Sequence, residues 1–187
     1  MPTIGVSIAV PDPFGADLQK FRVALGDESA RHIPTHITLV PPTEVPDSAL
    51  AGISSHLEKA AAGQQPFRVR LRGTGTFRPV SPVVFVGVVE GIAGCEMLSA
   101  GTRSGPLAAE ASFPYHPHVT VAHDLAEDKL DRAFAELADY EAGFEVEEFW
   151  LYVHDERHGW RPTEAFSLGE AQVGGGHEGG GPPPTWV

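Results

Sequence analysis

The amino-acid sequence predicts an α+β fold in which helices alternate with antiparallel strands. Three observations support this prediction. Short segments alternate apolar and polar residues at the strand period, and the segments between them carry apolar residues at the helical period. Glycine and proline punctuate the chain between the segments, as they do at turns. The order of elements around His36 recurs around His118, which indicates an internal duplication.

The first half of the chain is expected to begin with a strand and a helix. The helix follows the turn PDPFG and carries Leu18, Phe21 and Leu25 on one stripe. A second helix is expected to start near Asp47, because Pro46 and Asp47 resemble a helix start. The expected elements are a strand over Thr3–Val10, a helix over Ala16–Leu25, a strand over His36–Val40 that ends at Pro41, a helix from Asp47, and strands over residues 66–75 and 81–89.

Two of these strands differ in character. Residues 81–89 are nearly all apolar, which is typical of a buried strand. Residues 67–72 alternate strictly and place Arg68, Arg70 and Arg72 on one face. Such a basic stripe could guide a phosphate, but we interpret it as the solvated face of an edge strand, where charges discourage aggregation.

The second half is expected to repeat the pattern and to close with a pair of strands. Leu130, Phe134 and Leu137 define the inner face of its last helix. We expect a domain over residues 1–173 and a disordered tail over the Gly/Pro-rich residues 174–187. The expected elements are a helix over Gly94–Arg103, a strand over Pro117–His123, a helix over Glu127–Tyr140, and strands within residues 144–155 and 163–169.

Charge and composition exclude several classes of protein. The net charge is −12, and all of it arises after Arg103, where 4 basic residues face 16 acidic ones. Tight non-specific binding of long nucleic acid requires many cations, so we exclude it, whereas small anionic substrates remain compatible. The single cysteine, Cys95, cannot form an internal disulfide, and no apolar run reaches the ~18 residues of a membrane span. We expect a soluble cytoplasmic monomer.

Two tetrads carry the chemical signal. HITL (residues 36–39) and HVTV (residues 118–121) both read histidine, apolar, threonine, apolar. Strand side chains alternate between faces, so each tetrad would bury its apolar pair and present an imidazole beside a hydroxyl. One such strand usually has no special meaning. Two copies on alternating strands make coincidence much less probable, and packing about a pseudo-twofold axis would bring the two pairs face to face.

Two opposed histidines suit the cleavage of a phosphodiester. One neutral imidazole can take a proton from the attacking water or hydroxyl, while a protonated one gives a proton to the leaving oxygen. Histidine serves both roles because its ordinary pKa is about 6.5. Threonine hydroxyls can bind the non-bridging oxygens. Arg78, after a glycine-rich turn, could also reach a phosphate, and Tyr115 could stack on a base.

The tetrads resemble the paired His-x-Thr/Ser-hydrophobic motif of the 2H phosphoesterase superfamily, which includes RNA 2′,3′-cyclic phosphodiesterases and 2′-5′ RNA ligase-like proteins. The resemblance extends over about residues 3–170 and includes FPYHPHVTVAH around the second tetrad and the strand VVFVGV between the tetrads. It implies a bilobal fold with antiparallel sheets, flanking helices and a central cleft. It also implies metal-independent hydrolysis or transfer at 2′,3′-cyclic or related phosphodiesters.

Carried over residue by residue, the resemblance makes His36 and His118 the catalytic pair and Thr38 and Thr120 the phosphate-binding residues. It assigns proton donation to His36 and proton acceptance to His118. No cofactor is implied, and the expected substrate is a small cyclic phosphate, a nucleotide or an RNA end. The acidic second half departs from the more basic clefts of ligase-like members and favours a small substrate.

The histidines and the cleft also allow three other functions: a metal site, a binding protein and a ligase-like transferase. A metal site at His116, His118 and His123 is disfavoured, because Pro117 separates the first two and no carboxylate stands at a familiar ligand spacing. Two alternatives stay open. The same cleft could bind cyclic nucleotides or RNA ends without turnover, or the protein could join RNA ends as a 2′-5′ ligase-like transferase.

Overall fold

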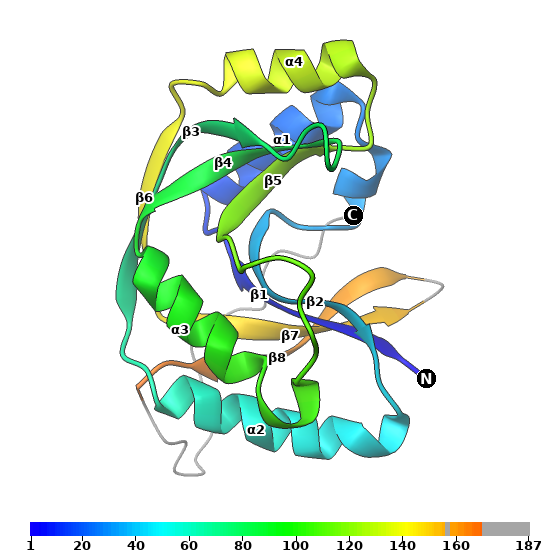
Figure 1. Ribbon diagram of the computed structural model, residues 1–187, viewed down its shortest axis with the longest axis vertical. Helices are drawn as coiled ribbons and strands as arrows, with labels where there is room; N and C mark the ends of the chain where they lie inside the picture. The colour runs from blue at the N-terminus through cyan, green and yellow to red at the C-terminus, as the bar shows by residue number, and fades with distance from the viewer. Residues whose placement is uncertain (156–157, 170–187) are drawn as a thin grey trace.

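The computed structural model describes residues 1–155 and 158–169. Its strands form one antiparallel sheet in the order β6-β3-β4-β5-β2-β1-β7-β8. The sheet is strongly curled, with helices at both ends of the molecule (Figure 1). The strands are β1 (Thr3–Ala9), β2 (His36–Glu44), β3 (Phe67–Thr76), β4 (Val83–Glu90), β5 (His118–His123), β6 (Glu141–Val146), β7 (Glu148–Asp155) and β8 (Gly159–Ser167), and the helices are α1 (Phe14–Leu25), α2 (Leu50–Ala62), α3 (Ile92–Thr102) and α4 (Glu127–Glu136).

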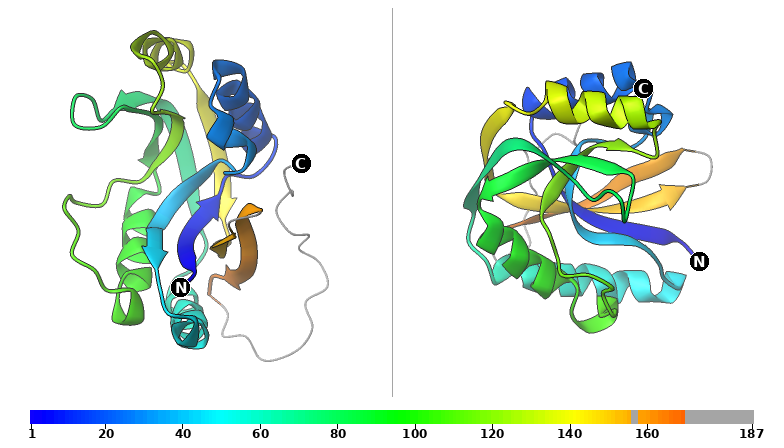
Figure 2. Two further views of the ribbon diagram at one scale, coloured as in Figure 1. Left: turned by 90° about the vertical axis from the view of Figure 1, so that its right-hand side faces the viewer. Right: turned by 45° about the horizontal axis from the view of Figure 1, so that its top comes forward.

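The sheet consists of two four-stranded halves that meet where β5 lies beside β2. The succession β1-α1-β2-α2 in the first half corresponds to β4-α3-β5-α4 in the second. Helices α1 and α4 contact β5, and helices α2 and α3 contact β8 and β2, respectively. Figure 2 shows these two helix pairs at opposite ends of the sheet. The predicted α+β fold with two related lobes is therefore confirmed, with the half-sheets joined into one.

The apolar residues of the two tetrads lie in the core of the protein. Ile37, Leu39, Val119 and Val121 are all fully buried. Full burial of an aliphatic side chain of this size contributes roughly 1.5–3 kcal/mol to folding. The histidines and threonines between them are half-buried. Burial of the apolar members thus fixes which face of each strand presents the imidazole and the hydroxyl.

Several predicted boundaries were wrong. Strand β2 does not end at Pro41 but continues to Glu44, and its pairing with β1 shifts register between Val40 and Thr43. Prolines, which lack an N–H group, are tolerated at such a bulge. Helix α4 ends at Glu136 rather than at residue 140. Residues 144–155, expected as one strand, divide between β6, at one edge of the sheet, and β7, which pairs with β1 and β8 in the other half.

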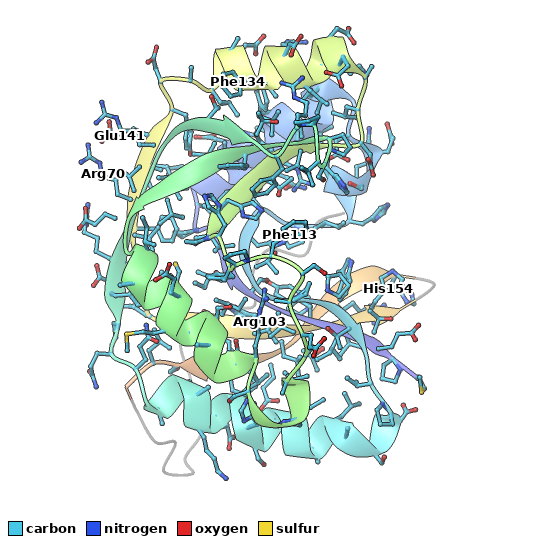
Figure 3. All side chains as sticks on the ribbon, viewed as in Figure 1. Arg70, Arg103, Phe113, Phe134, Glu141 and His154 are labelled. Carbon is cyan, nitrogen blue, oxygen red and sulfur yellow. The ribbon has the colours of Figure 1, made fainter. Side chains whose placement is uncertain are left out.

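The basic stripe lies on an interior strand rather than on an edge strand. Strand β3 has β4 on one side and β6 on the other. Arg70 forms an ion pair with Glu141 of β6, and Figure 3 shows both side chains on the outer surface of the sheet. Arg68 and Arg72 are exposed. The interpretation as a solvated face holds, but acidic residues of β6 supply the neighbouring charge.

Two further predictions concern the C-terminal tail and the absence of a membrane-spanning segment. The predicted tail, residues 174–187, lies outside the described residues. Within residues 1–155 and 158–169, none of the helices combines the length and the apolar character that crossing a bilayer would require.

The packing of Gly75 yields a testable prediction. A Cβ at Gly75 would lie 2.5 Å from the ring of Phe85, its partner across β3 and β4. Phe85 is buried and cannot move aside freely. We expect Gly75→Ala to lower the free energy of unfolding by about 1–3 kcal/mol, measured by urea denaturation.

Gly52 offers the matched control for this substitution. It is an exposed residue of α2, and an added Cβ would meet nothing within 4 Å. Gly52→Ala should therefore be neutral or stabilise the protein by up to about 1 kcal/mol, as alanine does in helices. Equal stability of the two variants would contradict the packing described for Gly75.

Candidate active site

Strands β2 and β5 bring the two tetrads side by side at the centre of the sheet. Ile37 pairs with Val119 in an antiparallel arrangement, so each step forward along β2 corresponds to one step back along β5. In this register His36 lies opposite Thr120, and Thr38 lies opposite His118. The imidazole and hydroxyl of one tetrad thus face the hydroxyl and imidazole of the other, as a twofold relation requires.

The two histidines make equivalent hydrogen bonds. His36 Nδ1 lies 2.6 Å from the carbonyl oxygen of Pro34, and His118 Nδ1 lies 2.6 Å from the carbonyl oxygen of His116. A carbonyl oxygen can only accept, so Nδ1 carries the proton in both rings. Each neutral ring therefore has its lone pair on Nε2, and this nitrogen is the one available to a substrate.

A buried polar network on α1 supports the His36 side. Arg22 donates to the carbonyl of Ile33 at 3.1 Å and forms an ion pair with Asp27 at 3.1 Å. Both members of this pair are about 5 % exposed.

Gln19 of the same helix adds two hydrogen bonds to this network. It donates to the Ile33 carbonyl, and it accepts from the Thr35 hydroxyl at 3.0 Å. The network holds the backbone on both sides of Pro34, whose carbonyl orients His36.

Aromatic rings support the His118 side instead. The ring of Phe77 lies edge-on to His118, with 5.0 Å between ring centroids, and Phe85 lies 5.2 Å away. The His116 ring packs against the same two phenylalanines. The two tetrads therefore share their geometry but have different surroundings, polar for His36 and aromatic for His118.

Both histidines have a pKa below the ordinary value. Burial lowers the pKa of His36, and the positive charges of Arg22 and protonated His118 lower it further, while the hydrogen bond to Pro34 opposes the shift. Burial also lowers the pKa of His118, again opposed by its hydrogen bond, and protonated His116 adds to the lowering. Both rings are therefore neutral in the free protein near neutral pH.

Two hollows flank the tetrads and share Thr38 and Val40 of β2. The smaller one, about 160 Å³, lies on the His36 side and is lined by Tyr152 and Trp160 among others. Burial raises the pKa of Tyr152 to about 12. The larger one, about 760 Å³, lies on the His118 side and is mostly lined by two loops, residues 77–81 and 107–116. A group held between the histidines would have room for a substituent on either side.

Three of the predicted substrate-binding residues, Tyr115, Thr120 and Arg78, differ in their position relative to the two hollows. Tyr115 lines the larger hollow and donates its hydroxyl to the Thr38 carbonyl at 2.9 Å, and burial raises its pKa. Thr120 is half-buried opposite His36 but lines neither hollow. Arg78 lines neither hollow and forms ion pairs with Glu127 and Asp131 of α4 at 2.7 and 2.8 Å. It is therefore already neutralised by carboxylates.

Sequence reasoning missed Arg103, which lines the larger hollow. A sequence signal existed, since Arg103 is the sole arginine or lysine between Arg78 and Lys129. Phe77, which also lines the larger hollow, had no signal that separates it from core aromatics. In residues 1–155 and 158–169, no group of three or more histidine, cysteine or acidic side chains is placed to hold a metal ion.

The histidine geometry predicts an observable protonation pattern. We expect ¹⁵N NMR of the imidazoles to show His36 and His118 with the proton on Nδ1 when neutral. Their titration midpoints should lie below about 6.5, the value for a solvated histidine, because burial disfavours the charged form. A proton on Nε2 in the neutral ring, or a midpoint above 6.5 in the free protein, would contradict the described site.

Comparison with known proteins places this site within a family. The family model described as the 2′-5′ RNA ligase superfamily matches residues 10–158. A Bacillus pumilus protein named "Putative phosphoesterase" is 31 % identical over 142 residues, which cover 74 % of this chain and 81 % of that protein. A protein of the same kind from Bacillus cytotoxicus is 30 % identical over 142 residues, with the same coverage of both chains.

Solved structures share the fold at lower identity. Escherichia coli LigT, crystallised with 3′-AMP, superposes with a TM-score of 0.66 at 22 % identity, covering 91 % of this chain and all of that one. A Thermus thermophilus protein superposes with a TM-score of 0.59 at 22 % identity and the same coverage. The match of the family model over most of the chain shows that the protein belongs to the 2′-5′ RNA ligase superfamily of 2H phosphoesterases.

Proposed function

We propose that the protein hydrolyses a 2′,3′-cyclic or related phosphodiester by acid–base catalysis between His36 and His118. One observation carries the proposal: the paired tetrads orient both imidazoles through the same Nδ1 hydrogen bond and leave both Nε2 atoms for a substrate. The LigT protein of the same fold was crystallised with 3′-AMP, a nucleotide that carries a phosphate on the ribose. Its ligand supports a nucleotide-sized substrate for this chain.

The mechanism follows from the two Nε2 atoms. The phosphate would sit between the histidines, and His118 Nε2 would take a proton from the attacking water as the new P–O bond forms. His36, protonated on Nε2, would give its proton to the leaving oxygen as the old P–O bond breaks. The product is a phosphomonoester with a free neighbouring hydroxyl, and the two histidines have exchanged protonation states, which return to the start through solvent.

The threonines would stabilise the negative charge on the non-bridging oxygens of the phosphate. Thr38 and Thr120 lie beside the histidines of the opposite tetrads and can donate their hydroxyls to the non-bridging oxygens. Donors fixed before the reaction cost little reorganisation in the transition state. Each proton transfer contributes typically 10²–10⁴-fold to the rate, so orientation and these hydrogen bonds supply the remainder. No step of this mechanism requires a metal ion.

Turnover by wild type and histidine variants tests the function directly. Purified protein with EDTA is incubated with each 2′,3′-cyclic nucleotide, and the phosphomonoester is quantified. We expect His36→Gln and His118→Gln each to lower kcat by about 10²–10⁴-fold, because one proton transfer is lost. His123→Gln is the matched control: His123 lies on the same strand as His118, but its exposed ring contacts Asp124.

Each alternative outcome has a separate meaning. Binding of cyclic nucleotides without product would establish a binding protein rather than an enzyme. Loss of activity with EDTA would contradict the metal-free mechanism. Joining of tRNA half-molecules by the purified protein, with little hydrolysis, would establish the ligase-like function.

The lowered histidine pKa values predict the pH dependence. Catalysis needs one ring protonated and the other neutral, so kcat/KM should follow a bell whose maximum lies midway between the two pKa values of the free enzyme. Both values lie below 6.5. The maximum of kcat/KM should therefore fall on the acidic side of pH 6.5, measured with a cyclic nucleotide at constant ionic strength. A maximum above pH 7 would contradict this assignment.

A further inference from the structure

Arg103 is attached to the backbone of the first tetrad. It follows the last residue of α3, and its Nε donates to the carbonyl of Leu39 at 2.6 Å. Its guanidinium lies over the ring of Tyr115, 5.3 Å from the centroid, and the Tyr115 hydroxyl donates to the neighbouring Thr38 carbonyl. These contacts fix the direction of the Arg103 side chain, and Figure 3 shows it in the central part of the molecule, between the two ends.

Arg103 forms no ion pair in the described part of the chain. Ion pairs neutralise five other arginines, which are Arg22, Arg31, Arg70, Arg78 and Arg132. Arg103 has none within residues 1–155 and 158–169, although Glu110 lines the same hollow. Its sole hydrogen bond described there uses Nε, so the four Nη–H donors remain for another partner. A half-buried, oriented guanidinium of this kind is well suited to an anion.

Arg103 lies on the side of the first tetrad away from His36. The reacting phosphate must contact both His36, which lines the smaller hollow, and His118, which lines the larger one together with Arg103. Arg103 is bound to the Leu39 carbonyl, three residues along β2 from His36 and beyond Thr38, so a group on its guanidinium would lie on the side of the phosphate away from His36. The larger hollow, about 760 Å³, is of the size that holds small-molecule ligands. Phe113 and Val80 line it while 69 % and 75 % exposed, and Figure 3 shows Phe113 on the loop before β5. The hollow therefore offers apolar surface for a base and one cation for a second anionic group.

We propose that Arg103 binds a second phosphate of the substrate, separate from the one that reacts. The inference rests on the proposed function. The substrate class is then a nucleoside cyclic phosphate whose sugar carries a further phosphate, rather than a simple cyclic mononucleotide. That phosphate is either a 5′-phosphomonoester or the phosphodiester that joins the preceding nucleotide of an RNA end. The recognised chemistry is the same in both cases.

Three substrates distinguish these cases. Adenosine 2′,3′-cyclic phosphate has no second phosphate, its 5′-phosphorylated form has a monoester, and the dinucleotide ApA with a terminal cyclic phosphate has a diester. We expect wild type to show a kcat/KM about 10- to 100-fold higher on at least one of the two longer substrates, mainly through KM, as charge-assisted hydrogen bonds predict. The substrate that gains most identifies the form of the second phosphate.

The ratio of kcat/KM between the phosphorylated and the simple substrate is the readout for Arg103. Arg103→Met should bring the ratio close to one, and Arg103→Lys should restore part of it. Arg72→Met is the matched control, because it removes one positive charge from an exposed position of β3 that lines neither hollow. Its ratio should equal that of wild type.

Two results would overturn the inference. Wild type could lack any preference for a second phosphate, or Arg103→Met could lower kcat/KM equally on all three substrates, which would assign Arg103 to the reacting phosphate or to folding. If no cyclic phosphate is hydrolysed at all, the proposed function fails. Calorimetric binding of adenosine 3′-phosphate and adenosine 3′,5′-bisphosphate then tests Arg103 separately, since wild type should favour the bisphosphate and Arg103→Met should not.

Discussion

Strands β2 and β5 pair in the sheet through Ile37 and Val119, and this pairing sets the geometry of the site. It joins the two half-sheets, and it fixes the register that places each histidine opposite the threonine of the other tetrad. Both residues are fully buried, so hydrophobic burial in the core maintains the alignment of polar groups on the opposite face. The shift of one strand by one residue would turn an imidazole into the core.

The two halves share this geometry but differ in the groups behind each histidine. A buried arginine–aspartate pair and a chain of hydrogen bonds hold the segment before His36, whereas phenylalanine rings pack against His118. Two lobes of similar architecture thus place their histidines in distinct environments. The hollows differ likewise, since the aromatic rings of Tyr152 and Trp160 line the small one, and the guanidinium of Arg103 lines the large one. Under the proposed function, this asymmetry would give a bound substrate a direction across the nearly symmetric pair of histidines.

Local patterns predicted the strands and helices well, because alternation and helical spacing follow from which face is buried. The α+β class was predicted from these patterns, and the facing arrangement of the two tetrads was predicted from the repeat. Pairings between distant segments were not, so the separation of β6 from β7 and the interior place of β3 went unseen. The surroundings of Arg78 and Arg103 could not be predicted for the same reason, because they depend on contacts with distant segments. Helix α4 supplies two carboxylates to Arg78, whereas Arg103 forms no ion pair in the described residues.

The central claim is that both tetrads bind one phosphate, and a crystal structure of the protein with inorganic phosphate tests it most directly. The account predicts a single anion within hydrogen-bond distance, about 2.7–3.1 Å, of Nε2 of His36 and His118 and of both threonine hydroxyls. Soaking at a pH below the pKa of both rings would favour binding, since each ring then donates. A phosphate that contacts one tetrad only, or that binds elsewhere and leaves both histidines without it, would contradict the account.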